Sequence, residues 1–298
     1  MSVNLENQIW MDGVFITLKL SNPALQASIY TVCDMLDDLK RVEALERVLD
    51  RSPIVEVKKI DERDPPRNPS SGFSEVLTRL VKERRRDYGV LVQSTSGGRI
   101  PFTTMMELRR MGRLGPVGKR DSGYSWISLT LNRKLLKDYD INEFRKLFLE
   151  VCTAVEAFYG GSAEDNIMCV QREIFMAKAA KNPLERKKNP DFDQEIWDVY
   201  WLNYFGAGYV QFWGQDKIDR LAEQYDVTRF VNGAVCVQTT PKPVFADPNA
   251  KGITDYPWKR HMYDVLGWNT FMHETQKQGK PGQYVPTLDD HRRILKQK

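Results

Sequence analysis

Hydrophobic and polar positions alternate along the chain with two different periods, which predict a mixture of helices and strands. Apolar residues three and four positions apart predict helices over Ala24–Asp50, Asn142–Tyr159 and Gln215–Tyr225. Short runs of β-branched and aromatic residues predict strands at Gly13–Leu20 and Trp126–Leu131. Weaker patterns of the same kinds predict strands at Ile54–Ile60, Tyr88–Gln93, Tyr209–Trp213 and Phe230–Gln238, and helices at Ser74–Arg86, Met105–Arg113 and Trp258–Trp268.

The order of these elements predicts an α+β protein with two similar halves. Each half is expected to contain a small mixed or antiparallel sheet covered by helices, because strand–helix–strand order occurs before residue 100 and again after Trp126. The predicted divisions are an N-terminal half at 1–118, a C-terminal half at 119–247 and an extended tail at 248–298. A single mixed sheet covered by helices is the nearest alternative.

Composition and charge restrict the class of protein only moderately. Hydrophobic residues make up 41% of the 298 residues, which is enough to form a real core. The 44 Lys and Arg residues against 40 Asp and Glu residues give a net charge of +4, well short of a dedicated nucleic-acid binder. No secretory signal or membrane-spanning run is visible, and the scattered cysteines are typical of reduced thiols. These features predict a cytoplasmic protein without a membrane partner.

The sequence contains few groups in an arrangement that suits catalysis. Its three histidines, His261, His273 and His291, lie near the C-terminal end and form no HExxH pair. Cys152 lies within the apolar pattern of the helix predicted at Asn142–Tyr159, where a thiol is more often part of the core than a nucleophile. We therefore expect a protein that is not an enzyme and that requires no cofactor or metal ion.

Two other kinds of site remain open. The basic segments Lys82–Arg86 and Arg109–Arg113 are suited to phosphate contacts, so a nucleic-acid-associated protein is the alternative function. The loop Ser94–Arg99 follows a predicted strand and offers backbone N–H groups to a phosphate, but it lacks the lysine of a P-loop. This loop keeps a small-molecule enzyme as a third interpretation.

An acidic segment adjoins the aromatic cluster of residues 197–213. Its four carboxylates are Asp191, Asp193, Glu195 and Asp198. Such a group is often a solvated face or a helix N-terminus. The functional interpretation is a docking surface for a basic partner, because opposite charge steers association.

The pattern of residues 197–243 resembles the bacterial type VI secretion immunity proteins that confer immunity to VRR-Nuc-type nuclease effectors. In that family a Trp and a Gly precede a strand, a second Gly opens a helix, and a third lies in a strand that ends in a Pro. These places are occupied here by Trp201, Gly206, Gly214, Gly233 and Pro243. The resemblance extends more loosely to the N-terminal strand and helix.

This resemblance implies a binding protein that acts in competition between bacteria. Members bind a cognate toxin and occlude it, so the chain is expected to be an antitoxin against a type VI-secreted toxin, with a nuclease as the expected target. The four carboxylates of the acidic segment then become the expected toxin-binding residues, and the five signature residues have a structural role. Because the chain is net basic, a neighbouring family of polymorphic-toxin immunity proteins is the alternative within this class.

Overall fold

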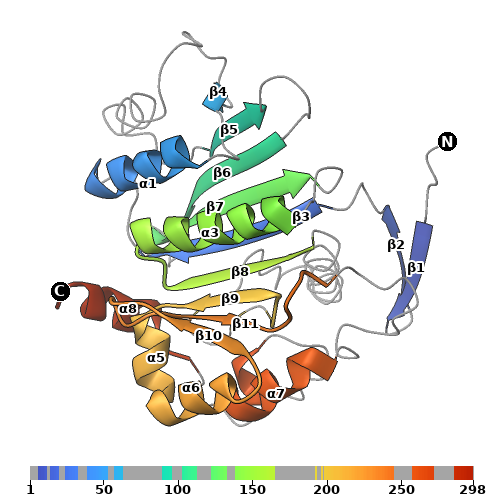
Figure 1. Cartoon of the computed structure of the whole chain (residues 1–298), viewed down its shortest axis with the longest axis vertical. Helices are drawn as coiled ribbons and strands as arrows, with labels where there is room; N and C mark the ends of the chain where they lie inside the picture. Colours follow the sequence, from blue (N-terminus) through green and yellow to red (C-terminus); the bar gives the residue numbers. More distant parts are fainter. Residues whose placement is uncertain are drawn as a thin grey trace, which may run out of the picture.

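The chain folds as an α+β protein in which helices cover both faces of one long antiparallel sheet (Figure 1). The structure is a computed structural model that describes residues 6–11, 14–19, 24–32, 39–52, 57–62, 89–95, 103–112, 122–132, 138–164, 192, 196, 198–244, 257–271 and 285–297. The predicted fold class is therefore confirmed.

Among the described residues, nine strands pair in the order β10-β11-β9-β8-β3-β7-β6-β5-β4, and each pairing is antiparallel. Their bounds are β3 (Ala24–Thr31), β4 (Val57–Glu62), β5 (Gly89–Thr95), β6 (Thr103–Gly112), β7 (Ser122–Asn132), β8 (Tyr159–Glu164), β9 (Leu202–Phe205), β10 (Asp226–Arg229) and β11 (Val235–Gln238). A separate hairpin consists of β1 (Glu6–Met11) and β2 (Val14–Lys19). The helices are α1 (Leu39–Arg51), α3 (Asp138–Ala154), α5 (Ala207–Trp213), α6 (Gln215–Ala222), α7 (Pro257–Leu266) and α8 (Leu288–Leu295).

The sheet is continuous across the two predicted halves. Strand β3 pairs with β7 on one side and β8 on the other, so that Ile29 lies opposite both Ile127 and Gly160. One antiparallel sheet therefore replaces the expected sheet in each half, as in the single-sheet alternative. The predicted boundary between residues 118 and 119 lies outside the described residues.

Alternating side chains of the central strands form a separate core on each face of the sheet. Leu25 and Ile29 of β3 pack with α1 and α3, which lie side by side on one face (Figure 1). Tyr30 has the opposite orientation and packs with Tyr159 and Phe205 in the second core, to which α5, α6, α7 and α8 also contribute. The second core is the more aromatic of the two and surrounds the residues described below.

Three predicted elements have a different secondary structure in the protein. The first part of the helix predicted at Ala24–Asp50 is strand β3, because β7 and β8 pair with it on both sides, and only the later part is α1. The helix predicted at Met105–Arg113 lies in β6, which pairs with both β5 and β7. The strand predicted at Tyr209–Trp213 lies in α5, where Tyr209 and Trp213 share one buried face at i, i+4 spacing.

Other predicted elements agree with the structure to within a few residues. Strands β2, β4, β5 and β7 overlap the segments predicted at Gly13–Leu20, Ile54–Ile60, Tyr88–Gln93 and Trp126–Leu131, and α3, α6 and α7 overlap the helices predicted at Asn142–Tyr159, Gln215–Tyr225 and Trp258–Trp268. In the strand predicted at Phe230–Gln238, the first residues form a turn and Val235–Gln238 form β11. The helix predicted at Ser74–Arg86 lies outside the described residues. Within the described part, no helix combines the length and the apolar character needed to cross a bilayer.

Candidate functional site

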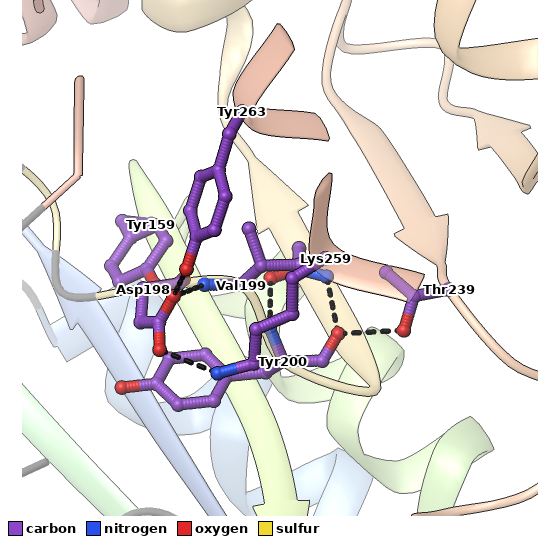
Figure 2. A network of polar contacts seen from close by, with 8 residues as sticks. Tyr159, Asp198, Val199, Tyr200, Thr239, Lys259 and Tyr263 are labelled. Carbon is purple, nitrogen blue, oxygen red and sulfur yellow. Dashed lines mark hydrogen bonds and ion pairs between the residues drawn. The ribbon is translucent and has the colours of Figure 1, made fainter. Parts of the chain in front are cut away.

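Asp198 lies in the protein interior, where it joins the segment before β9 to helix α7 (Figure 2). Lys259 Nζ donates a hydrogen bond to Asp198 Oδ2 at 2.6 Å. The hydroxyl of Tyr263 and the backbone N–H of Val199 both donate to Asp198 Oδ1. The Tyr159 hydroxyl, from β8, donates to the Asp198 carbonyl oxygen at 3.2 Å.

The burial of Asp198 corrects the expectation that it belongs to an exposed toxin-binding surface. Asp191, Asp193 and Glu195 lie outside the described residues, so their part in such a surface stays a prediction.

The positive charge of Lys259 and the negative charge of Asp198 are paired inside the protein, away from solvent. The Lys259 side chain is fully buried, and this desolvation lowers its pKa, while the nearby Asp198 carboxylate opposes the shift. Burial raises the pKa of Tyr263, so its hydroxyl stays protonated and donates to the carboxylate. Because these groups are enclosed by the core, the arrangement is suited to holding α7 against the sheet and not to contact with an outside molecule.

A second set of polar contacts fixes the strand ends beside this ion pair. The Asn203 side chain accepts from the backbone N–H of Tyr200 and donates to its carbonyl oxygen, each at 2.8 Å. The Thr239 hydroxyl donates to the same carbonyl at 2.9 Å (Figure 2). The Trp201 indole N–H donates to the carbonyl oxygen of Thr240 at 3.0 Å. Trp201 thus connects the start of β9 to the chain that leaves β11.

The three glycines of the pattern at residues 201–243 are needed for the conformation and close packing of the backbone. Gly206 lies so close to the start of β8 that a Cβ there would be 2.7 Å from the Ala157 carbonyl oxygen. The Gly206 N–H donates to the Phe158 carbonyl oxygen at 2.8 Å. Gly214, between α5 and α6, and Gly233, in the turn before β11, both have a φ of 82°, which a glycine adopts at low cost. Pro243 is buried beyond the end of β11. These positions shape the β9–β11 region and carry no reactive group.

The described cysteines and histidines are also enclosed or bonded within the fold. Cys152 and Cys236 are buried free thiols, and burial raises the pKa of Cys236 to about 12 and that of Cys152 well above its ordinary value. His261 Nε2 lies 3.0 Å from the Arg220 carbonyl oxygen, and His273 lies outside the described residues. Within the described ranges, no three His, Cys, Asp or Glu side chains are grouped to hold a metal ion.

His291, on α8, is packed between aromatic rings in the second core. Its ring centroid lies 4.9 Å from that of Phe158 and 4.8 Å from that of Tyr209, and the residue is 3% exposed. A Cβ at Gly208 would overlap the imidazole, so Gly208 makes room for it. Burial lowers the pKa of His291 to about 3, although Asp290 partly opposes the shift. The imidazole is therefore neutral at physiological pH.

We expect this histidine to make the protein less stable in mild acid. The folded pKa lies below the unfolded value near 6.5, so the contribution to stability is complete above about pH 6.5 and decreases as the pH falls toward 3. Between pH 7 and pH 5, the loss should reach about 2 kcal/mol. Urea unfolding at both pH values measures it, and His291→Gln should remove most of this difference. An equal pH dependence in both proteins would show that His291 titrates normally in the folded state.

The other predicted segments are only partly covered by the described structure. Arg109 and Arg110 lie in β6, whereas Lys82–Arg86 and Arg113 lie outside the described residues. Ser94 and Thr95 end β5, and the remainder of the Ser94–Arg99 loop is likewise outside. The nucleic-acid and phosphate-loop interpretations therefore stay predictions.

A groove on the outside of the molecule is a more accessible feature. It has a volume of about 350 Å³ and lies where α1, α3 and the β10–β11 turn meet. Its lining residues are Ala44, Arg47, Val48, Arg51, Leu149, Glu150, Thr153, Ala154 and Phe230. Beside it, Val231 at the tip of the turn is fully exposed. Neither feature was predicted from the sequence.

Comparison with known proteins identifies a class of fold. No family model and no curated protein matches the sequence. The fold is similar to that of the Pseudomonas aeruginosa T6SS protein PA0821, with a TM-score of 0.52 and 14% sequence identity. The similarity covers 91% of this chain and 81% of that chain. At this identity, the comparison establishes a common fold.

Proposed function

We propose that this protein is a cytoplasmic immunity protein, which binds a toxin delivered by a type VI secretion system and occludes it. The expected toxin is a nuclease, and the expected partner is a single cognate effector. The protein acts as a stoichiometric inhibitor, without turnover and without a cofactor. Its function would protect the producing cell and its kin from their own effector.

The observation that carries this proposal is the similarity of fold to PA0821 over 91% of the chain. PA0821 is a type VI secretion system protein, which is the same context that the sequence pattern implies. The pattern of Trp201, Gly206, Gly214, Gly233 and Pro243 lies around β9, α5, α6 and β11. The resemblance in sequence pattern and the similarity of fold therefore support the same context.

The state of the reactive side chains also favours a binding protein. The Asp198–Lys259 pair is buried and holds α7, and the two buried thiols, Cys152 and Cys236, have raised pKa values. His291 is neutral and enclosed by aromatic rings. These groups have roles in packing, and the accessible features of the described ranges include a groove and an exposed apolar turn. Such features are suited to contact with another protein.

Protection of cells provides the test of this function. The effector encoded by the neighbouring open reading frame is expressed in a sensitive bacterium, with and without this protein. We expect growth to be restored by this protein and not by an unrelated immunity protein. A second toxin from a different system serves as the control, and its toxicity should be unchanged. Unrelieved toxicity of the neighbouring effector, with both proteins present in soluble form, would contradict the proposal.

The stoichiometry of inhibition separates an inhibitor from an enzyme. Purified protein is titrated into the active effector, and the remaining nuclease activity is measured. An occluding inhibitor should abolish the activity at about one equivalent per effector. Inactivation of a large excess of effector by a trace of this protein would instead indicate catalytic turnover.

A further inference from the structure

The turn between β10 and β11 is a rigid platform that presents an apolar side chain to solvent. The Phe230 N–H donates to the Ala234 carbonyl oxygen and the Gly233 N–H donates to that of Phe230, each at 2.9 Å. Asn232 Oδ1 accepts from the Ala234 N–H at 3.1 Å, which closes the turn with a side chain. Val231 is fully exposed at the tip, where polar residues, Gly and Pro are normally preferred. The fold itself therefore gives no reason for a valine at this position.

The groove beside Val231 is also held in a fixed shape. Arg41 of α1 donates to the carboxylate of Glu156, which follows the end of α3, with Nε at 3.1 Å, and this contact links the two helices. Phe230 lies at one side of the groove, and its ring packs on that of Tyr204 with centroids 5.6 Å apart. The apolar part of the lining consists of Ala44, Val48, Leu149 and Ala154, with Phe230 beside them. A partner would meet this surface with little loss of conformational freedom.

The charge at the rim of the groove is predominantly positive. Arg47 and Arg51 are exposed on α1, and the Arg51 Nε donates to the Arg47 carbonyl oxygen at 3.0 Å. Neither arginine forms an ion pair with any residue in the described ranges. Among the described residues of the lining, Glu150 of α3 is the one carboxylate. Two guanidinium groups around an apolar lining are complementary to a segment with carboxylates on either side of an apolar side chain.

We propose that this groove, together with Val231, is a surface that docks the effector, through an acidic segment of the effector that carries an apolar side chain. The inference rests on the proposed function and assigns its binding surface. Val231 inserts into the effector as an apolar anchor, while Arg47 and Arg51 pair with its carboxylates. Exposed apolar anchors ringed by polar contacts are typical of tight protein interfaces.

Binding kinetics with substituted proteins test this assignment. The probe is the purified effector encoded by the neighbouring open reading frame, in an inactive form, immobilised on a biosensor. We expect Val231→Asp to weaken binding at least tenfold, and the turn tolerates this change because Asp is favoured at such positions. We expect Arg47→Glu with Arg51→Glu to weaken binding at least tenfold, mainly through slower association, and to reduce its salt dependence.

Two control proteins carry comparable changes away from the groove. Phe212→Asp alters another exposed apolar residue, on α5, and Arg220→Glu with Arg260→Glu gives the same charge change on α6 and α7. Both controls should bind within about twofold of the unchanged protein. If the unchanged protein binds and the groove variants bind equally well, the docking assignment is wrong while the proposed function stands. If the folded, unchanged protein fails to bind, the proposed function and this inference are both overturned.

Discussion

Replacing Lys259 with Met is expected to lower the free energy of unfolding by about 3–5 kcal/mol. The change leaves the Asp198 carboxylate buried with its Tyr263 and Val199 donors but without its cation. An unpaired buried charge carries a desolvation penalty that two neutral donors do not offset. Urea unfolding followed by circular dichroism at pH 7 gives the measurement.

The double variant, Lys259→Met with Asp198→Asn, is the matched control. An amide has no net charge, and its oxygen still accepts hydrogen bonds from Tyr263 and Val199. We expect this protein to recover at least half of the lost stability, because the buried negative charge has been removed together with its partner. If the single variant is as stable as the unchanged protein, the ion pair does not hold α7 to the sheet.

Gly206→Ala is expected to destabilise the protein by about 3 kcal/mol. The added Cβ would lie 2.7 Å from the Ala157 carbonyl oxygen and 2.9 Å from Phe158 Cα. Both are backbone atoms, held near Gly206 by its hydrogen bond to the Phe158 carbonyl oxygen. The chain therefore has to move either at the start of β8 or at the start of α5. The melting temperature and the urea midpoint measure the loss.

Gly214→Ala provides the comparison for this variant. Gly214 has a φ of 82°, but a Cβ there would meet no atom within 4 Å. With φ at 82° and ψ at 158°, its cost is that of the backbone conformation alone, about 1–3 kcal/mol. A Gly206→Ala protein that is more stable than Gly214→Ala would contradict the role of close backbone approach at Gly206.

Local patterns predicted elements well where one face of the element is buried. Helix α3 is an example, because Phe144, Leu147, Phe148 and Val151 are all buried at helical spacing. Strand β3 was predicted as a helix because Leu25 and Ile29 are also four residues apart, which fits either period. The ladders to β7 and β8 decide the outcome, and they depend on residues about 100 or more positions away. Such long-range pairing leaves no signal in the local sequence.

The same limit applies to α5 and β6. The segment Tyr209–Trp213 is rich in aromatic residues, which favours a strand by composition. In the fold, the Trp213 ring packs on Phe205 at 4.9 Å and on Tyr209 at 5.0 Å, and a helix satisfies both contacts. For β6, pairing with a neighbour on each side overrides its own helical pattern. Tertiary contacts, and not the local sequence preference, therefore determine the secondary structure of α5 and β6.

The polar residues of the interior were the hardest to predict. Asp198 follows three carboxylates in the sequence, so it has the appearance of a surface residue. A signal for its partner was present, because Lys259 lies on the apolar side of α7 with Met262, Tyr263 and Leu266. A lysine within such a stripe indicates a buried partner, but it does not identify that partner. The exposed groove and Val231 depend on how α1, α3 and the turn meet, which the sequence patterns did not indicate.

The measurement that tests the central proposal most directly is calorimetric titration of this protein into the inactive effector encoded beside it. The account predicts a one-to-one complex with a dissociation constant of about 10⁻⁹ M or lower, as expected for a protein inhibitor. Val231→Asp measured in the same experiment should bind at least tenfold more weakly. Two folded proteins that give no heat of binding and elute separately from a sizing column at micromolar concentration would contradict the account.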